Sequence, residues 1–234
     1  MPQLKKYLNA WSRYHHSSGF GIHSPYAYSF VRNVWRQRLP YYAYAGIRQL
    51  IGTVAAGSTR GQRRKMDLIS EREARLLFRV TNFFNPRHIL QLGAATGIES
   101  VAMLAVSQES RLYLFDEHLE ARELALRVLH SQWDRVENYH DITVAASEFL
   151  EEPVASGTYR LALVNTPVDD AVIQGLLDAR CIVCMRNLHR DGAMRALYDA
   201  SCRYMPAGQT YTNDKIAILN PNPKLQREDF LLWL

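Results

Sequence analysis

The sequence ILQLGAATGIES at residues 89–100 decides the predicted fold. An apolar, strand-like run at residues 88–92 leads into the small-residue turn GAATG at residues 93–97, and residues 97–107 have a helical pattern. A glycine turn lets a ligand approach the backbone closely, and the N-terminus of the following helix contributes free N–H groups and partial positive charge. The stretch therefore predicts the first strand, the ligand-binding turn and the first helix of an open α/β sheet.

Strand and helix patterns alternate along the rest of the chain. Further strands are predicted at residues 111–115, 142–146, 159–164 and 181–185, and helices at residues 118–130, 169–179 and 192–205. Runs at 209–213 and 215–220 flank the corner Asn213-Asp214 and predict an antiparallel hairpin, and residues 229–234 predict one more edge strand. This order predicts a Rossmann-like α/β fold, with a mostly parallel sheet, helices on both faces and a C-terminal antiparallel hairpin.

Residues 1–65 form a basic, aromatic segment. They contain eight Arg, three Lys and no acid, so they carry +11, whereas the rest of the chain carries −6. Ser24-Pro25 predicts the start of a helix that ends near Arg36. Interleaved basic and aromatic residues suit nucleic acid, a membrane surface or an anionic small molecule, and they also suit aromatics packed on the body with Arg heads in water. We expect a helical N-terminal extension at 1–65 and an α/β domain at 66–234, which opens with a helix capped by Ser70 and Glu73.

The cysteine content predicts a cytoplasmic location for the chain. Its three cysteines, Cys181, Cys184 and Cys202, do not form a disulfide-rich pattern. The sequence has no uncharged apolar stretch of about 18 residues and no secretory signal pattern, so we expect no membrane span. The oligomeric state does not follow from the sequence.

An acidic residue ends the second predicted strand. Asp116 follows Gly93 by 23 residues, and a carboxylate at that place can accept hydrogen bonds from a ribose diol. Glu117 is adjacent and offers the same chemistry. The two glycines of the turn are four residues apart, unlike the three glycines of dinucleotide-binding loops, so a nucleotide other than a dinucleotide is the better match.

These two features resemble a known family. Residues 89–100 resemble the first motif of class I S-adenosylmethionine (SAM)-dependent methyltransferases, and LFDE at 114–117 resembles their second motif. Within that superfamily the chain is most similar to small O-methyltransferase-like proteins of Bacteroides-type bacteria, with His-Ser-Pro-Tyr at 23–26. The resemblance implies SAM as cofactor. The cofactor-binding residues that it implies are Gly93, Ala94, Ala95, Gly97, Asp116, Glu117 and, at the end of the third predicted strand, Ala146 and Ser147.

Several positions depart from the family pattern. The acid that usually precedes the first glycine by two residues is Gln91, and the acid that usually ends the fourth strand is Asn165. Arg186 and Asn187 stand where the relatives have two aspartates after the fifth strand. Because divalent cations prefer carboxylate oxygens, we expect no metal site.

The sequence therefore predicts metal-independent methyl transfer from SAM to an unidentified small-molecule or anionic acceptor. The candidate catalytic residues are Asn165 and His189, the latter as a general base because it titrates near neutrality. Two alternatives remain. One is a catalytically inactive binding protein with degenerate motifs on the same fold, and the other is a nucleic-acid-associated protein that acts through residues 1–65.

Overall fold

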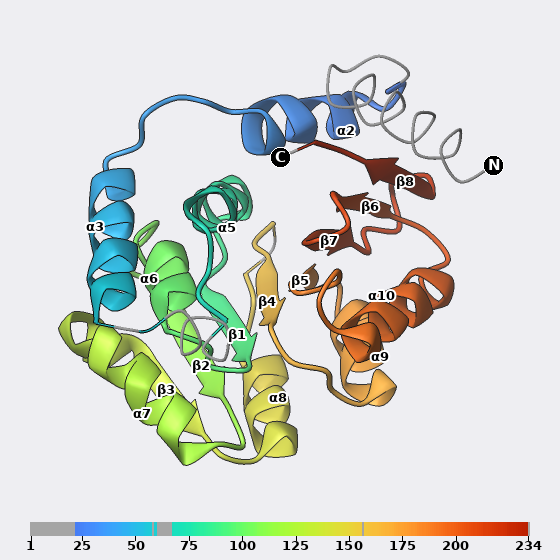
Figure 1. The fold of residues 1–234 in the computed structure, drawn as a ribbon. Helices are drawn as coiled ribbons and strands as arrows, with labels where there is room; N and C mark the ends of the chain where they lie inside the picture. Colours follow the sequence, from blue (N-terminus) through green and yellow to red (C-terminus); the bar gives the residue numbers. More distant parts are fainter. Residues whose placement is uncertain (1–21, 58, 60–66, 156, 234) are drawn as a thin grey trace.

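The computed structural model describes residues 22–57, 59, 67–155 and 157–233. Eight strands of this described chain form one sheet (Figure 1). The strands are β1 (His88–Leu92), β2 (Arg111–Phe115), β3 (Val136–Tyr139), β4 (Arg160–Val164), β5 (Ile182–Met185), β6 (Gln209–Thr212), β7 (Ala217–Asn220) and β8 (Glu228–Leu231). Their order is β3-β2-β1-β4-β5-β7-β6-β8. The sheet reverses its winding between β1 and β4, the place where open α/β sheets bind ligands at the carboxyl ends of the strands.

The first five strands are parallel, and the last three form the C-terminal edge. β7 is antiparallel to both β5 and β6, and β8 adds to β6 in parallel. Between β6 and β7 the chain turns at Asn213-Asp214, where Asp214 has a φ of 67° and the Asn213 N–H donates to the Ile216 carbonyl. The Rossmann-like sheet with a C-terminal hairpin, predicted from the sequence, is confirmed.

Helices cover both faces of the sheet (Figure 1). One face carries α2 (Pro25–Phe30), the π-helical turn η1 (Val31–Trp35), α3 (Ala43–Ala56), α5 (Glu71–Phe84), α6 (Ile98–Leu104) and α7 (Leu119–Val128). The other carries α8 (Ile142–Glu151), α9 (Asp170–Asp178) and α10 (Gly192–Tyr204), and a short 3-10 segment, η2 (His130–Arg135), precedes β3. Side chains alternate between the faces along each strand, so neighbouring residues enter different cores. Cys184 lies in the core under α5 and α6, and Cys181 in the core under α9 and α10, as the strand reading of CIVCM at 181–185 predicts.

Local capping signals place the helix ends. The Ser24 hydroxyl accepts a hydrogen bond from the Ala27 N–H, with Pro25 in the first turn. Ser70 and Glu73 form the predicted capping box at the start of α5. This helix ends at Phe84, and Asn85 follows in the left-handed conformation with a φ of 44°.

The prediction of a strand at residues 142–146 is wrong. The third strand is β3, four residues long and half-exposed at the sheet edge, and residues 142–151 form helix α8. Asp141 caps this helix, since its carboxylate accepts hydrogen bonds from the N–H groups of Thr143 and Val144. The β-branched run ITV suggested a strand, but the Asp141 cap and the burial of Ala145 and Phe149 on one helical face favour the helix.

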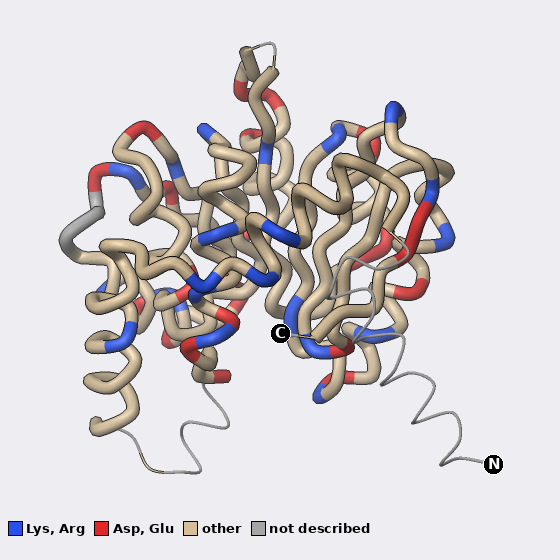
Figure 2. Tube along the Cα trace, turned by 90° about the horizontal axis from the view of Figure 1, so that it is seen from above, with Lys and Arg blue, Asp and Glu red and all other residues tan. Residues whose placement is uncertain are grey.

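The described part of the N-terminal segment packs on the body. Residues 1–21 and 60–65 lie outside the described residues, and so does most of the basic run that follows Gly57. Within residues 22–57, Phe30, Trp35 and Tyr44 are buried in the same core as α5, whereas Arg32, Arg36 and Arg48 are exposed. Basic and acidic residues are interspersed along the described chain (Figure 2). None of the helices in the described residues is both long and apolar enough to cross a membrane.

Candidate functional site

The turn between β1 and α6 has an unusual backbone. Gly93, Ala95 and Gly97 have φ values of 90°, 47° and 77°, in the left-handed region that favours glycine. A Cβ at Gly93 would lie 3.0 Å from Thr166 Cγ2, so the ends of β1 and β4 approach closely there. The turn therefore folds tightly across the carboxyl edge of the sheet.

Asp116 ties this turn to the end of β2. One carboxylate oxygen accepts a hydrogen bond from the Ala94 N–H at 2.8 Å, and the other accepts from the His118 N–H at 2.9 Å. The side chain of Arg122 donates to the Asp116 carbonyl. Because a carboxylate offers about four acceptor positions, Asp116 keeps capacity for a ligand's hydroxyl groups.

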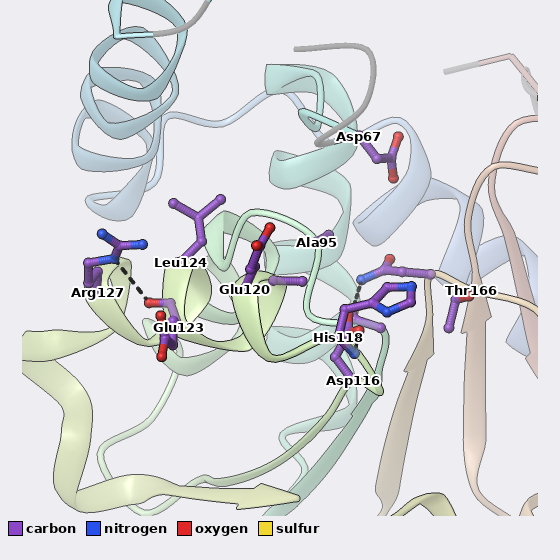
Figure 3. Close-up of a pocket in the computed structure, with 12 residues that line it drawn as sticks. Asp67, Ala95, Asp116, His118, Glu120, Glu123, Leu124, Arg127 and Thr166 are labelled. Atoms are coloured by element: carbon purple, nitrogen blue, oxygen red, sulfur yellow. Dashed lines mark hydrogen bonds between the residues drawn. The ribbon is translucent and has the colours of Figure 1, made fainter. Parts of the chain in front are cut away.

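A cavity of about 540 Å³ opens beside these groups (Figure 3). Its volume is in the range typical of small-molecule sites. The residues that line it are Asp67, Gly93, Ala95, Asp116, His118, Glu120, Ala121, Glu123, Leu124, Arg127, Asn165 and Thr166. The α7 residues form one wall, and the ends of β1, β2 and β4 form the floor. Four of the lining residues are acidic and one is an arginine, so the cavity suits a ligand with positive charge.

Most predicted cofactor-binding residues lie at or next to this cavity. Ala94 is buried, and its N–H donates to Asp116. Gly97 lies at the start of α6, next to the backbone of α7. The Glu117 side chain is 76% exposed, and its carboxylate lies 3.6 Å from the His118 ring. Neither Ala94, Gly97 nor Glu117 is among the described residues that line the cavity.

Ala146 and Ser147 do not end a strand. Both lie in the second turn of α8, where the Ser147 hydroxyl donates to Glu151. Their predicted contact with the cofactor assumed that residues 142–146 form a strand, which they do not. Within the described chain, the cavity wall is formed by α7 and not by α8.

A buried ion pair lies behind the turn. The Arg186 guanidinium donates to Glu99 at 2.7 Å, with only 2% and 0% of the two side chains exposed. Thr96 donates to the second oxygen of Glu99 at 3.2 Å. Burial raises the pKa of Glu99, and the Arg186 charge opposes that shift. The pair joins the first turn of α6 to the end of β5.

Two amides hold the turn from below. Gln91 donates to the carbonyls of Gly93 and Ala94 and accepts from the Ser100 hydroxyl at 2.6 Å. Asn165 donates to the Gly93 carbonyl at 2.8 Å and accepts from Arg186 at 3.0 Å. These contacts hold both amides in place, and Asn165 also lines the cavity, so its catalytic role stays a prediction.

Asp67 enters the site from the segment before α5. Its carboxylate accepts from Asn187 at 2.6 Å and from Arg190 at 2.9 Å, and Arg186 lies 3.3 Å away. Asp67 was not predicted as a site residue, because nothing in its immediate neighbours distinguishes it. His118 was not predicted either, although its position two residues after Asp116 was a usable signal.

His189 lies on the exposed loop after β5, outside the cavity lining in the described structure. Partial burial lowers its pKa, and the positive charges of Arg190 and Lys215 lower it further. These effects favour the neutral imidazole, which is the form that can accept a proton. The described residues contain no group of three or more His, Cys, Asp or Glu side chains arranged to hold a metal ion.

Comparison with known proteins identifies the fold of the chain. No protein-family model and no curated protein matches the chain. Among solved structures, a methyltransferase from Geobacter sulfurreducens covers 80% of this chain and 91% of its own, with a TM-score of 0.54 and 16% identity. The SAH-bound methyltransferase PaMTH1 of Podospora anserina covers 80% and 90%, with a TM-score of 0.56 and 12% identity. The O-methyltransferase TomG of Streptomyces achromogenes, solved in complex with SAM, covers 80% and 94%, with a TM-score of 0.53 and 14% identity. The chain therefore has the fold of SAM-dependent methyltransferases.

Proposed function

We propose that the protein binds SAM in the cavity beside β1, β2 and β4 and transfers its methyl group to an acceptor. The observation that carries this proposal is the position of Asp116. Its carboxylate lies at the carboxyl edge of the sheet, beside a glycine turn with positive φ, in a cavity of about 540 Å³. A ribose diol placed there finds two carboxylate oxygens whose positions are fixed by backbone N–H groups.

The residues present fit this cofactor. Four acids line the cavity, and SAM carries a net positive charge at neutral pH, so attraction favours binding. The left-handed turn allows the ligand to approach the backbone at Gly93 and Ala95. Solved neighbours of the same fold hold SAM or SAH, which supports the assignment.

Transfer would be metal-independent. Asn165 and Arg186, at the ends of β4 and β5, are engaged with each other, and a buried guanidinium repels a divalent cation. Bound SAM supplies a methyl group that is already activated by the sulfonium. The protein then has to align the acceptor with that methyl and exclude water, which can supply much of the rate. His189, a neutral imidazole on the loop after β5, remains the candidate to take a proton from the acceptor.

The test is calorimetric titration of SAM and SAH into the wild type, Asp116→Asn and Glu117→Gln. We expect Asp116→Asn to weaken both ligands by about tenfold or more, because it removes a charged acceptor while keeping the side-chain shape. Glu117→Gln is the matched control, and its affinity should equal that of the wild type because Glu117 is exposed and is not among the described residues that line the cavity. Absence of SAM and SAH binding to folded wild type would sink the proposal.

A cofactor-binding protein without transferase activity is the second candidate. It is favoured by the hydrogen bonds that tie Asn165 to Gly93 and to Arg186, and Arg186 to Glu99, since these groups already have partners within the protein. An acceptor screen with radiolabelled methyl-SAM separates the two. Labelled product supports transfer, whereas tight SAM binding without any product supports the binding protein. For the first candidate, the SAM-dependent methyltransferase, we also propose a cytoplasmic location. We further propose that it is most similar to small O-methyltransferase-like proteins of Bacteroides-type bacteria.

A further inference from the structure

Thr166 follows the end of β4 by two residues and lines the candidate cavity beside the glycine turn. The strands β2, β1 and β4 are neighbours and end at the same level, since Leu92 is paired with both Phe115 and Val164. Asp116 and Thr166 therefore lie on opposite sides of the turn, two strand spacings or about 10 Å apart at the backbone. Figure 3 shows both residues at the wall of the cavity.

Three local features fix the Thr166 side chain. Pro167 follows it, and a residue before proline is restricted to extended backbone conformations. Threonine is β-branched, so few rotations about χ1 are available to it. Its methyl carbon faces Gly93, since a Cβ built on that glycine would lie 3.0 Å from Thr166 Cγ2 and 3.2 Å from Thr166 Cβ. The hydroxyl group is therefore directed away from Gly93.

The Thr166 hydroxyl is available to a ligand. Within the described part of the chain it has no hydrogen-bond partner, and the residue is half-buried at the cavity wall. The neighbouring amide differs, because Asn165 donates to the Gly93 carbonyl and accepts from Arg186. At the β4 end of the cavity, Thr166 therefore offers a fixed polar atom to whatever the cavity holds.

The proposed place of the ribose determines which part of the cofactor reaches Thr166. In SAM the sulfur is bonded to C5′, on the far side of the ribose ring from the diol that Asp116 would hold. From Asp116 the cavity extends along α7, where Ala121 and Leu124 offer apolar surface for the adenine ring, and in the other direction over Gly93 to Thr166. With the adenine along α7, the sulfur and its methyl group lie over the end of β4.

We propose that the Thr166 hydroxyl oxygen contacts the sulfonium methyl group of SAM and raises the affinity of the site for SAM relative to SAH. This inference rests on the proposed function and deepens it. The sulfonium charge polarises the C–H groups of the methyl, and a hydroxyl oxygen has lone pairs that can receive them. SAH lacks this methyl and has a neutral sulfur, so the same oxygen gains little from it. Thr166 is then a specificity-determining residue that favours the substrate form of the cofactor over the product.

The first test is calorimetric titration of SAM and SAH into the wild type, Thr166→Val and Thr53→Val. Valine keeps the branched shape and the contact with Gly93 but lacks the hydroxyl, so Thr166→Val should weaken SAM by about two- to fivefold and leave SAH unchanged. Thr53→Val is the matched control, because Thr53 is exposed on α3 and is not among the described residues that line the cavity, and it should change neither affinity.

The possible outcomes separate the inference from the proposed function. Equal weakening of SAM and SAH in Thr166→Val, or no change in either, would overturn the inference and leave the proposed function intact. Failure of the wild type to bind both ligands would remove the proposed function, and the inference with it.

The second test uses sinefungin, in which an amine-bearing carbon replaces the sulfonium and its methyl. The protonated amine would donate a charge-assisted hydrogen bond to the Thr166 hydroxyl, so Thr166→Val should weaken sinefungin by about tenfold or more. Thr166→Ser keeps the hydroxyl and lacks the Cγ2 methyl, and it should retain most of the affinity. A serine variant as weak as the valine variant would mean that packing against Gly93, and not the hydroxyl, sets the preference, which would contradict the inference.

Discussion

Gly97 shows how a single residue sets the approach of two helices. It has a φ of 77°, and a Cβ built on it would lie 2.8 Å from both the Cα and the carbonyl oxygen of Ala125 in α7. Real Cβ atoms do not approach backbone that closely, so the absence of a side chain allows α7 to pack over the start of α6. Since α7 forms one wall of the cavity, this contact also shapes the site.

Replacement of Gly97 by Ala should therefore destabilise the fold. We expect a loss of at least about 1–2 kcal/mol from the left-handed backbone alone, with the clash against Ala125 adding to it. Gly175→Ala is the control, because Gly175 lies within α9 with no atom near its Cβ position, and alanine there should stabilise by about 0.4–1 kcal/mol. Guanidinium unfolding measures both, and equal effects at the two positions would refute this role of Gly97.

The elements themselves were largely predictable, because their signals are local. Strand periodicity, glycine turns and capping residues such as Ser24 and Ser70 depend on neighbours in sequence. The failure at residues 142–146 has the same origin: a short β-branched run resembles a strand, and β3 (Val136–Tyr139) is a polar edge strand with weak alternation.

The glycine turn and Asp116 could be predicted from the sequence, whereas Asp67 could not. The glycine turn and Asp116 each follow an apolar strand directly, so the sequence indicates both. Asp67 is positioned by Asn187 and Arg190, which lie 120 and 123 residues further along the chain. Only the tertiary fold brings these side chains together, and no local pattern marks them.

The ion pair between α6 and the end of β5 carries a prediction at the level of elements. Glu99→Ala leaves Arg186 buried without its closest partner, so we expect a loss of about 3–5 kcal/mol in the free energy of unfolding. Asp199→Ala, which breaks the exposed pair with Arg195 on α10, should cost about 0–1 kcal/mol. Denaturant titration distinguishes the two, and a Glu99→Ala loss no larger than that of Asp199→Ala would mean that the buried pair contributes little.

At the scale of the whole molecule, the N-terminal segment and the sheet share a core. The Phe30 ring lies 4.3 Å from the ring of Tyr211 in β6 and 5.3 Å from that of Phe83 in α5, measured between centroids. The Trp35 indole N–H donates to the Trp233 carbonyl, and α2 lies beside the C-terminus in Figure 1. These aromatic side chains pack inside the protein and are not available to nucleic-acid bases. A nucleic-acid role for the basic segment would therefore depend on charge and on residues outside the described part.

The boundary at residue 65 remains a prediction, and a core substitution can test whether it separates two folding units. Phe30→Ala removes a fully buried ring from the shared core, so we expect a loss of about 3–5 kcal/mol in a single cooperative transition. Tyr28→Ala, on the exposed side of the same helix, should change stability by about 0.5 kcal/mol or less. Circular dichroism and intrinsic fluorescence should report the same midpoint. If Phe30→Ala instead produced two transitions, with the main one at the wild-type midpoint, the segment would be a separate unit.

A shared transition would mean that deleting residues 1–65 unfolds the protein. RNA and DNA binding should then be tested by replacing basic residues such as Arg32 and Arg36, because these are exposed and can lose their charge without disturbing the core.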